Sequence, residues 1–424
     1  MPHCRMYFIV FSLLSCSSMV WAQQPLSFQD CVELVKKNNA DLQSSEESYK
    51  SSQFQVDASK AGYMPQVSAS LGYAKSGNNS SSVADTTSGD SYTAAITASQ
   101  NLFKGFADSA KVDQARGQSR VSEASLRSTK AQVSYDLKNA FAMALYAKDA
   151  LKITEDIMKR RNDNLGIVEL RYDSGRENKG SFLLSQANYK QSKLDNLKAQ
   201  YNKEVSQSDL KKVIGLAMNE VVEIKDDIPL NAPPAVEPDF NAIAARTPDR
   251  QQYEAQVEVS QGALESAKSG FFPSLDLTGS VGQIGQNFYP NDYDRWSVGA
   301  TLTLPLFSGG RDYYSTKSVT SQLYAAKANL AGIEKSLLTN LKSAFAAYVI
   351  AVEQLAVDEA FLTAAKTRAD IARSKYNNGL MSFEDWDTIE NDLINKTKSY
   401  ITSKRDRIIA EASWEKAQGV GALP

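Results

Sequence analysis

The densest group of ionisable side chains in this sequence is a run of five carboxylates: Glu384, Asp385, Asp387, Glu390 and Asp392. Acids in the first turn of a helix are ordinary capping residues, and Ser382 with Asp385 fits a capping box. If several copies of the chain surrounded an opening, the same acids would form a ring that favours cations and hinders anions. Both interpretations stay open until the elements that place these residues are known.

Residues that usually catalyse reactions or bind metals are almost missing. The chain of 424 residues has one histidine, His3, and three cysteines, of which only Cys31 lies beyond the first 22 residues. The rest of the chain therefore cannot form a Ser-His-Asp triad, a Cys-His pair, a histidine-ligated zinc site or an internal disulfide. It also has no P-loop and no dinucleotide fingerprint. We expect no enzyme, no cofactor and no metal site, and a buried structural role for Cys31.

The first 22 residues have the layout of a secretory signal. Arg5 supplies a basic start, residues 6–14 are apolar, and a stretch of small residues ends at Ala22. A rival interpretation is a lipoprotein signal in which Cys16 is acylated, and either signal would export the protein. No later apolar run reaches the ~20 residues that a membrane-spanning helix needs. The net charge of −2 gives no reason to expect a nucleic acid partner.

Long tracts without proline predict long helices. The tracts are rich in Ala, Leu, Lys, Gln and Ser, and their apolar residues recur at three- and four-residue spacings. We expect long helices over 106–172 and 311–378, and shorter ones over 28–61, 181–214, 241–269 and 382–417. Each long helix would extend about 100 Å, which indicates an elongated molecule.

The chain resembles itself. RYDSG matches KYNNG, with Tyr172 and Tyr376 lying 204 positions apart, and NLFKG matches PLFSG at the same offset. A repeat of this length indicates two similar halves rather than a solenoid. We assign the halves to residues 23–228 and 241–424, joined by a proline-rich linker at 229–240.

Each half also contains a pair of alternating segments, one pair within 64–104 and the other within 272–307. Apolar and small polar residues alternate with period two, which is typical of outer-membrane barrel strands, although a hairpin with one buried face would show the same pattern. The apolar positions expected to face lipid include Leu71, Ile96, Leu277, Val298 and Leu302. Four strands cannot close a membrane barrel, so two, three or four chains would have to supply 8, 12 or 16 strands.

The order of these elements resembles that of the TolC-like outer-membrane efflux proteins over nearly the whole chain beyond the signal. The segments that carry the resemblance are LSFQDCVELVKKNNADL, the paired AKAGYMP and AKSGFFP, the paired NLFKG and PLFSGG, and KYNNGLMSFEDW. The resemblance implies a homotrimer, mainly α with some β. Its 12-stranded barrel in outer-membrane lipid would be continued by a long α-helical barrel in the periplasm. It also implies an exit duct for efflux or type I secretion that works with a periplasmic adaptor and an inner-membrane pump.

Two turns should form the periplasmic tip in this family. Gly175 and Gly379 each follow a long helix and fit left-handed helix caps. By resemblance, these glycines with Tyr172 and Tyr376 would lie where an adaptor docks, although the tyrosines could instead pack between helices. Gly175 stands six positions before Ser181, whereas Gly379 stands three before Ser382, so we expect three extra residues in the first turn.

The resemblance also places the acidic run at the periplasmic aperture. Asp385 is the first candidate for a carboxylate ring, with Asp387 second and Glu384 beside them. The rival from another class is an exported helical rod without channel activity. The cargo and the identity of the pump and adaptor do not follow from the sequence.

Overall fold

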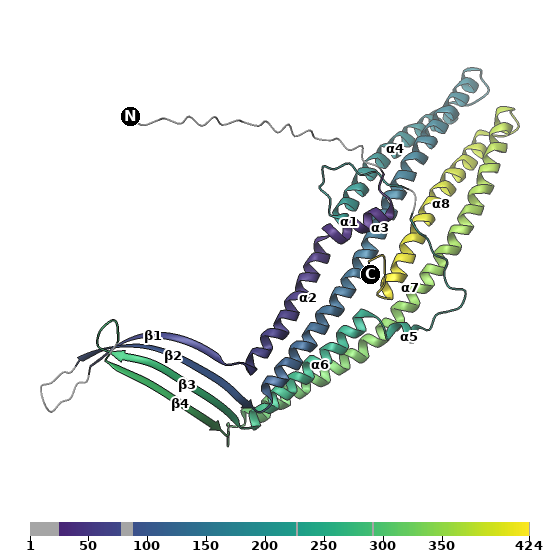
Figure 1. The fold of residues 1–424 in the computed structure, drawn as a ribbon. Helices are drawn as coiled ribbons and strands as arrows, with labels where there is room; N and C mark the ends of the chain where they lie inside the picture. The colour runs from purple at the N-terminus through teal and green to yellow at the C-terminus, as the bar shows by residue number, and fades with distance from the viewer. Residues whose placement is uncertain (1–24, 78–87, 226–227, 291, 424) are drawn as a thin grey trace, which may run out of the picture.

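The computed structural model describes residues 25–77, 88–225, 228–290 and 292–423. A curved β-sheet lies at one end of the molecule, and a bundle of helices leads away from it (Figure 1). The predicted signal, with Cys16 and Ala22, lies outside the described residues.

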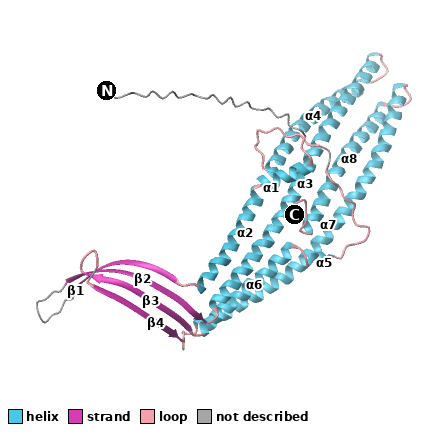
Figure 2. Ribbon diagram, in the orientation of Figure 1, coloured by secondary structure: helices cyan, strands magenta, loops and turns pink. Residues whose placement is uncertain are grey.

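Two long helices form the axis of the molecule. α3 (Ala107–Asp173) and α7 (Arg311–Asn377) each contain 67 residues, and both ends of α7 lie 204 positions after those of α3. At 1.5 Å per residue each helix is about 100 Å long. Figure 2 shows them running from the sheet to two separate turns at the far end. The internal repeat is therefore kept in register over the whole length of both helices.

Shorter helices pack along the long ones. From the far turns, α4 (Lys179–Ile214) returns beside α3, and α8 (Phe383–Ala417) returns beside α7. On the side toward the sheet, α2 (Ala40–Ser59) packs on α3, while α6 (Pro248–Lys268) lies between α3 and α7.

Two predicted helices are broken in the structure. The helix expected over 28–61 is divided into α1 (Phe28–Asn38) and α2, because Asn39 is extended and caps α2 through its side chain. The helix expected over 241–269 is divided into α5 (Phe240–Ala244) and α6. There Thr247 caps α6 and Pro248 takes the first helical position, where no N–H is needed.

The sheet has four antiparallel strands in sequence order. They are β1 (Gln66–Gly77), β2 (Ser88–Lys104), β3 (Ser274–Gly285) and β4 (Tyr293–Thr303). Strands β2 and β3 join the two halves of the chain in one sheet. Within the described residues, β1 and β4 are edge strands whose outer backbone groups pair with no other strand.

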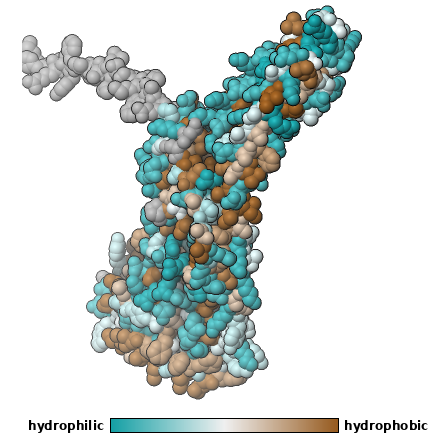
Figure 3. Space-filling view, turned by 90° about the vertical axis from the view of Figure 1, so that its right-hand side faces the viewer, coloured by the Kyte–Doolittle hydropathy of each residue, from teal (hydrophilic) through white to brown (hydrophobic). Residues whose placement is uncertain are grey.

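The strand register separates an apolar face from a polar one. Directly opposed residues share a face, and the pairings align Leu71 with Ala94, Ile96 with Val281, and Val298 with Gly279. Leu277 and Leu302 fall on the same face. All five residues predicted to face lipid therefore lie on one side of the sheet. They are 39% to 90% exposed in the single chain. Figure 3 shows hydrophobic surface gathered at the end of the molecule that carries the sheet.

The main core lies midway along the bundle. Cys31, Leu137, Phe141 and Leu210 are fully buried there, with α1 packed on α3 and α4. Cys31 is thus the small core residue that its neighbours in the sequence predicted. Among the described helices, none combines the length and the hydropathy needed to cross a bilayer.

Candidate functional site

The two turns at the far end of the helices are built alike. Gly175 and Gly379 adopt φ values of 71° and 73° and donate their N–H groups to the carbonyls of Tyr172 and Tyr376, both at 2.9 Å. The helix that follows begins after Asn178 in the first half and after Ser382 in the second, three positions beyond each glycine. The prediction that the first turn contains three extra residues is therefore wrong.

That prediction failed because it matched Ser181 with Ser382. The true counterpart of Ser382 is Asn178, whose side chain accepts a hydrogen bond from the Ser181 N–H at 2.9 Å. Asn and Ser cap helices about equally well, so the identity of the cap is not preserved although its position is. The two tips consequently differ in their side chains and not in their backbone.

A stacked aromatic pair underlies each turn. Tyr376 stacks on Trp386 with ring centroids 4.2 Å apart, and Tyr172 stacks on Phe182 at 5.3 Å. Both partners are ten residues after their tyrosine, so the repeat conserves the contact. Tyr376 and Trp386 are 1% exposed, whereas Tyr172 is half-buried. Burial removes Tyr376 from the surface where an adaptor contact was predicted, because its ring fills the core of the tip.

Tyr376 also joins the two halves of the chain. The Arg171 guanidinium lies 4.6 Å from the centre of the Tyr376 ring and donates to its carbonyl oxygen at 2.7 Å. The Tyr376 hydroxyl donates to the Glu177 carboxylate at 3.0 Å. Burial, and then the hydrogen bond to Glu177, raise the pKa of Tyr376 well above its ordinary value. The tyrosine therefore stays neutral. It holds the helical hairpin formed by α3 and α4 against the helical hairpin formed by α7 and α8.

The five acids from Glu384 to Asp392 differ in their partners and in their exposure. Glu390 is 1% exposed and accepts two hydrogen bonds from Arg160, at 2.6 Å to Nε and 2.7 Å to Nη2. Asn164 donates a third, at 3.1 Å. The hydrogen bonds to Glu390 hold the pKa of Arg160 above its ordinary value. Since Arg160 and Asn164 belong to α3 and Glu390 to α8, this pair is a buried joint between the halves.

Asp387 makes a second joint beside the first. Arg161 donates to its carboxylate at 3.0 Å, and the two side chains are 8% and 15% exposed. Asn188 and Asn391 also donate to Asp387. The charge of Asp387 is therefore matched within the chain, which favours a structural role over a free carboxylate at an aperture.

Glu384 and Asp385 remain exposed to solvent. Asp385 accepts a hydrogen bond from the Ser382 hydroxyl at 2.8 Å, and its N–H donates to the same oxygen. In the part of the chain that the structure describes, neither acid forms an ion pair. By contrast, Asp392 pairs with the exposed Arg368 at 3.1 Å. Of the five acids, Glu384 and Asp385 are thus the two that are exposed and that no basic side chain neutralises within the described residues.

Several residues of the tip were not predicted from the sequence. Arg160 and Arg161 lie inside a long helix with no local pattern that marks them, and their partners are more than 220 positions away. A comparison of the two halves of the repeat could have drawn attention to these arginines. The positions 204 residues later hold Ala364 and Ala365, so the arginine pair is a feature of the first half only.

The comparisons with known proteins agree with this architecture. The model of the outer membrane efflux protein family matches residues 31–216 and 240–420, which is most of the chain. The chain belongs to the outer membrane efflux protein family. AprF, the alkaline protease secretion protein of Pseudomonas aeruginosa, is 23% identical over 299 residues, which are 67% of this chain. The chain spans 61% of AprF, less than two thirds of its length.

Solved structures of outer-membrane channels share the fold of this family member. The outer-membrane channel OprN has a TM-score of 0.82 at 17% identity, covering 94% of this chain and 91% of OprN. The outer membrane protein VceC of Vibrio cholerae has a TM-score of 0.81 at 17% identity, covering 93% of this chain and 96% of VceC. The mainly α fold with one four-stranded antiparallel sheet per chain is thus that of the outer-membrane channels.

Proposed function

We propose that three copies of this chain form an outer-membrane exit duct, a passive conduit for a tripartite efflux or type I secretion system. The observation that carries the proposal is the four-stranded sheet with two open edges, one apolar face and one polar face. Unpaired backbone groups are not tolerated in lipid, so such a sheet must close with copies of itself. Three sheets, with β4 of one chain paired to β1 of the next, give a barrel of 12 strands.

Aromatic residues on the apolar face support a membrane position. Tyr73 and Tyr92 lie side by side at the end of the sheet remote from the helices, with ring centroids 5.0 Å apart. Phe103 and Phe106 meet at 5.2 Å at the opposite end. From Tyr92 to Phe103 the strand rises roughly 25–30 Å along a barrel axis at the usual tilt, close to the height of the apolar band of such barrels. The two clusters would act as interfacial girdles, with Leu71, Ile96, Leu277 and Val298 facing lipid between them. Leu302 would face lipid in the same cross-strand row as Phe103.

The tip of the helices would be the gate. In a trimer, six hairpins would surround the opening, and contacts within a chain would alternate with contacts between chains. Within a chain, Arg160 and Arg161 lock α3 to α8. The repeat puts Ala364 and Ala365 at the corresponding positions of α7, and Gln186 at the position of Glu390. The contact between chains thus lacks both ion pairs, so opening would separate neighbouring chains rather than the two halves of one chain.

The exposed turns would be the docking surface for a periplasmic adaptor. Gly175 and Gly379 lie in turns of the same backbone shape, so an adaptor would meet six similar turns around the trimer. Tyr172 remains a candidate contact for the adaptor because its side chain is only half-buried. Tyr376 is no longer a candidate, because its side chain is buried. Because no nucleotide motif occurs in the sequence, energy would come from an inner-membrane pump coupled through the adaptor.

The proposal is tested by fractionating cells and running the protein on gels without heating. A trimer in the outer membrane that dissociates on heating supports the duct. A soluble periplasmic monomer would instead support the rival, an exported helical rod.

A further inference from the structure

The polar face of the sheet is almost free of charge. Opposed pairs along it are Ser68 with Thr97, Ser280 with Ser297, and Thr278 with Gly299. Among the described strand residues, three charged side chains share this face: Lys104, Asp276 and Arg295. Lys104 and Asp276 lie toward the helices, and Arg295 lies alone toward the opposite end.

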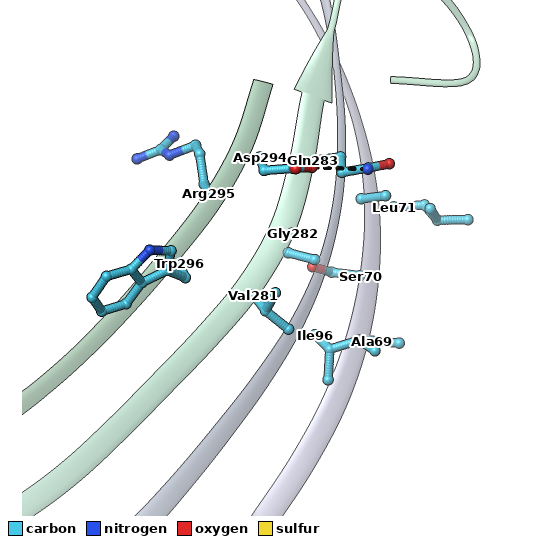
Figure 4. A pocket seen from close by; sticks show the side chains of 12 residues that line it. Ala69, Ser70, Leu71, Ile96, Val281, Gly282, Gln283, Asp294, Arg295 and Trp296 are labelled. Carbon is cyan, nitrogen blue, oxygen red and sulfur yellow. Dashed lines mark hydrogen bonds between the residues drawn. The ribbon is translucent and has the colours of Figure 1, made fainter. Parts of the chain in front are cut away.

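Arg295 stands in a row of small residues. Its cross-strand neighbour is Gly282, followed by Ala95 and Ser70 on the next two strands. A hollow of about 840 Å³ lies against the sheet at this level, lined in part by these four residues (Figure 4). A Cβ on Gly282 would come within 2.4 Å of the Ala94 carbonyl oxygen, so no larger residue fits there. Arg295 is exposed in the single chain, and none of the three residues that share its row is large enough to cover it.

Among the described strand residues, no acid on the same face neutralises Arg295. Asp276 is six residues from Gly282 along β3, about 20 Å away, and it accepts a hydrogen bond from Asn101 at 3.1 Å. Asp294 precedes Arg295 in the chain, but it lies on the apolar face, where Gln283 donates to it at 2.9 Å. Arg295 makes no ion pair within the described part of the chain. Its positive charge is thus uncompensated on the polar face.

We propose that Arg295 determines charge selectivity at the outer end of the duct, where it would favour solutes that carry negative charge. The inference rests on the proposed function, because the polar face becomes the lumen wall only when the barrel closes. Three copies would then form one ring of guanidinium groups on a wall of Ser and Thr. This ring is opposite in sign to Glu384 and Asp385 at the other end of the molecule.

The test is the reversal potential of the purified full-length protein in planar bilayers under a salt gradient. Arg295→Ser should lower the anion-to-cation permeability ratio by about two- to fourfold at 0.1 M salt, as expected for three charges roughly 10 Å away across water. Arg295→Lys should keep the ratio. The reversal potential does not depend on how many channels are open, so a closed resting state does not obscure the result.

Two matched variants isolate the effect. Asp294→Asn changes the adjacent residue on the opposite face and should leave the ratio unchanged. The background Glu384→Gln/Asp385→Asn removes the exposed tip carboxylates, and Arg295→Ser should lower the ratio in it as well. The proposed role of Arg295 is contradicted if the channel conducts and Arg295→Ser leaves the permeability ratio unchanged, both in the unmodified protein and in the Glu384→Gln/Asp385→Asn background. If the unmodified protein conducts no current and also forms no heat-dissociable trimer, the proposed function itself fails.

Discussion

Arg160 of α3 holds Glu390 of α8 through two hydrogen bonds of 2.6 and 2.7 Å, and the glutamate is 1% exposed. The two residues come from different halves of the repeated chain, 230 positions apart. A buried carboxylate requires such a partner, because its desolvation costs several kcal/mol when it is unpaired. The pair therefore fixes the position of the second hairpin against the first.

Removing the charge of Glu390 should loosen the contact between the two helical hairpins at the tip. Glu390→Gln leaves Arg160 without its carboxylate, and we expect the free energy of unfolding to fall by about 2–3 kcal/mol. Chemical denaturation followed by circular dichroism measures the change. Asp392→Asn is the matched control, because its partner Arg368 is 61% exposed and such pairs contribute at most about 1 kcal/mol. Equal losses in the two variants would contradict the role of the buried pair.

Cation selectivity at the tip should depend on two of the five acids. Glu384→Gln/Asp385→Asn should reduce the cation preference of single channels by about two- to fourfold at low salt. Asp387→Asn should leave that preference nearly unchanged, since Arg161 already matches the charge of Asp387. A larger effect from Asp387→Asn than from the double variant would show that the ring lies elsewhere.

Alkaline pH should destabilise the helical bundle through Tyr348. Burial, and then the nearby Glu411 carboxylate, raise the pKa of Tyr348 to about 12. Because the folded pKa exceeds the ordinary value of 10.0, the stabilisation is complete below pH 10 and is lost as pH rises from 10 towards 12. The loss is at most about 1.4 kcal/mol per pH unit.

Tyr348→Phe provides the comparison. The wild-type hydroxyl donates to the Asn231 carbonyl in the linker at 2.5 Å, so at neutral pH the variant should be less stable by about 1 kcal/mol. Urea unfolding at about pH 8 and about pH 11.5 should show this advantage of the wild type shrinking or reversing. A constant difference across that range would mean that Tyr348 does not titrate as described.

Two adjacent residues on β4 should differ in how well they tolerate substitution by arginine. Val298 lies on the apolar face and Ser297 on the polar face. Val298→Arg should cost about 2–4 kcal/mol near the bilayer midplane and reduce the amount of heat-dissociable trimer. Ser297→Arg places the charge toward the lumen and should assemble normally. Equal assembly of both variants would contradict the assignment of the two faces.

Much of the fold could be predicted from the sequence because the signals are periodic and long. Proline-free tracts predicted the long helices, and period-two alternation placed Leu71 and Val298 on a shared face. The break at Asn39 was missed because it depends on one cap within a helical pattern. The break at Thr247 was missed although the cap is followed by Pro248 at the first position of α6. Such a local signal is easily outweighed by the periodicity around it.

The tip was harder to predict because its residues meet only through the fold. The run from Glu384 to Asp392 looks uniform in sequence, yet Glu390 is buried and paired while Asp385 is exposed. What separates them is the approach of Arg160 and Arg161 from the other half of the chain. No local pattern encodes that approach.

The most direct test of the duct is disulfide crosslinking between the two open edges of the sheet. One cysteine would replace Ser70 on β1, and a second would be placed in turn at Ser297, Gly299 and Thr301 on β4, all on the polar face. Within one chain, three strand spacings of about 4.8 Å separate β1 from β4, too far for an internal disulfide. Oxidation should therefore give a ladder on denaturing gels that ends at a covalent trimer. A product that stays monomeric, or a ladder that ends at two or four chains, would contradict the 12-stranded barrel.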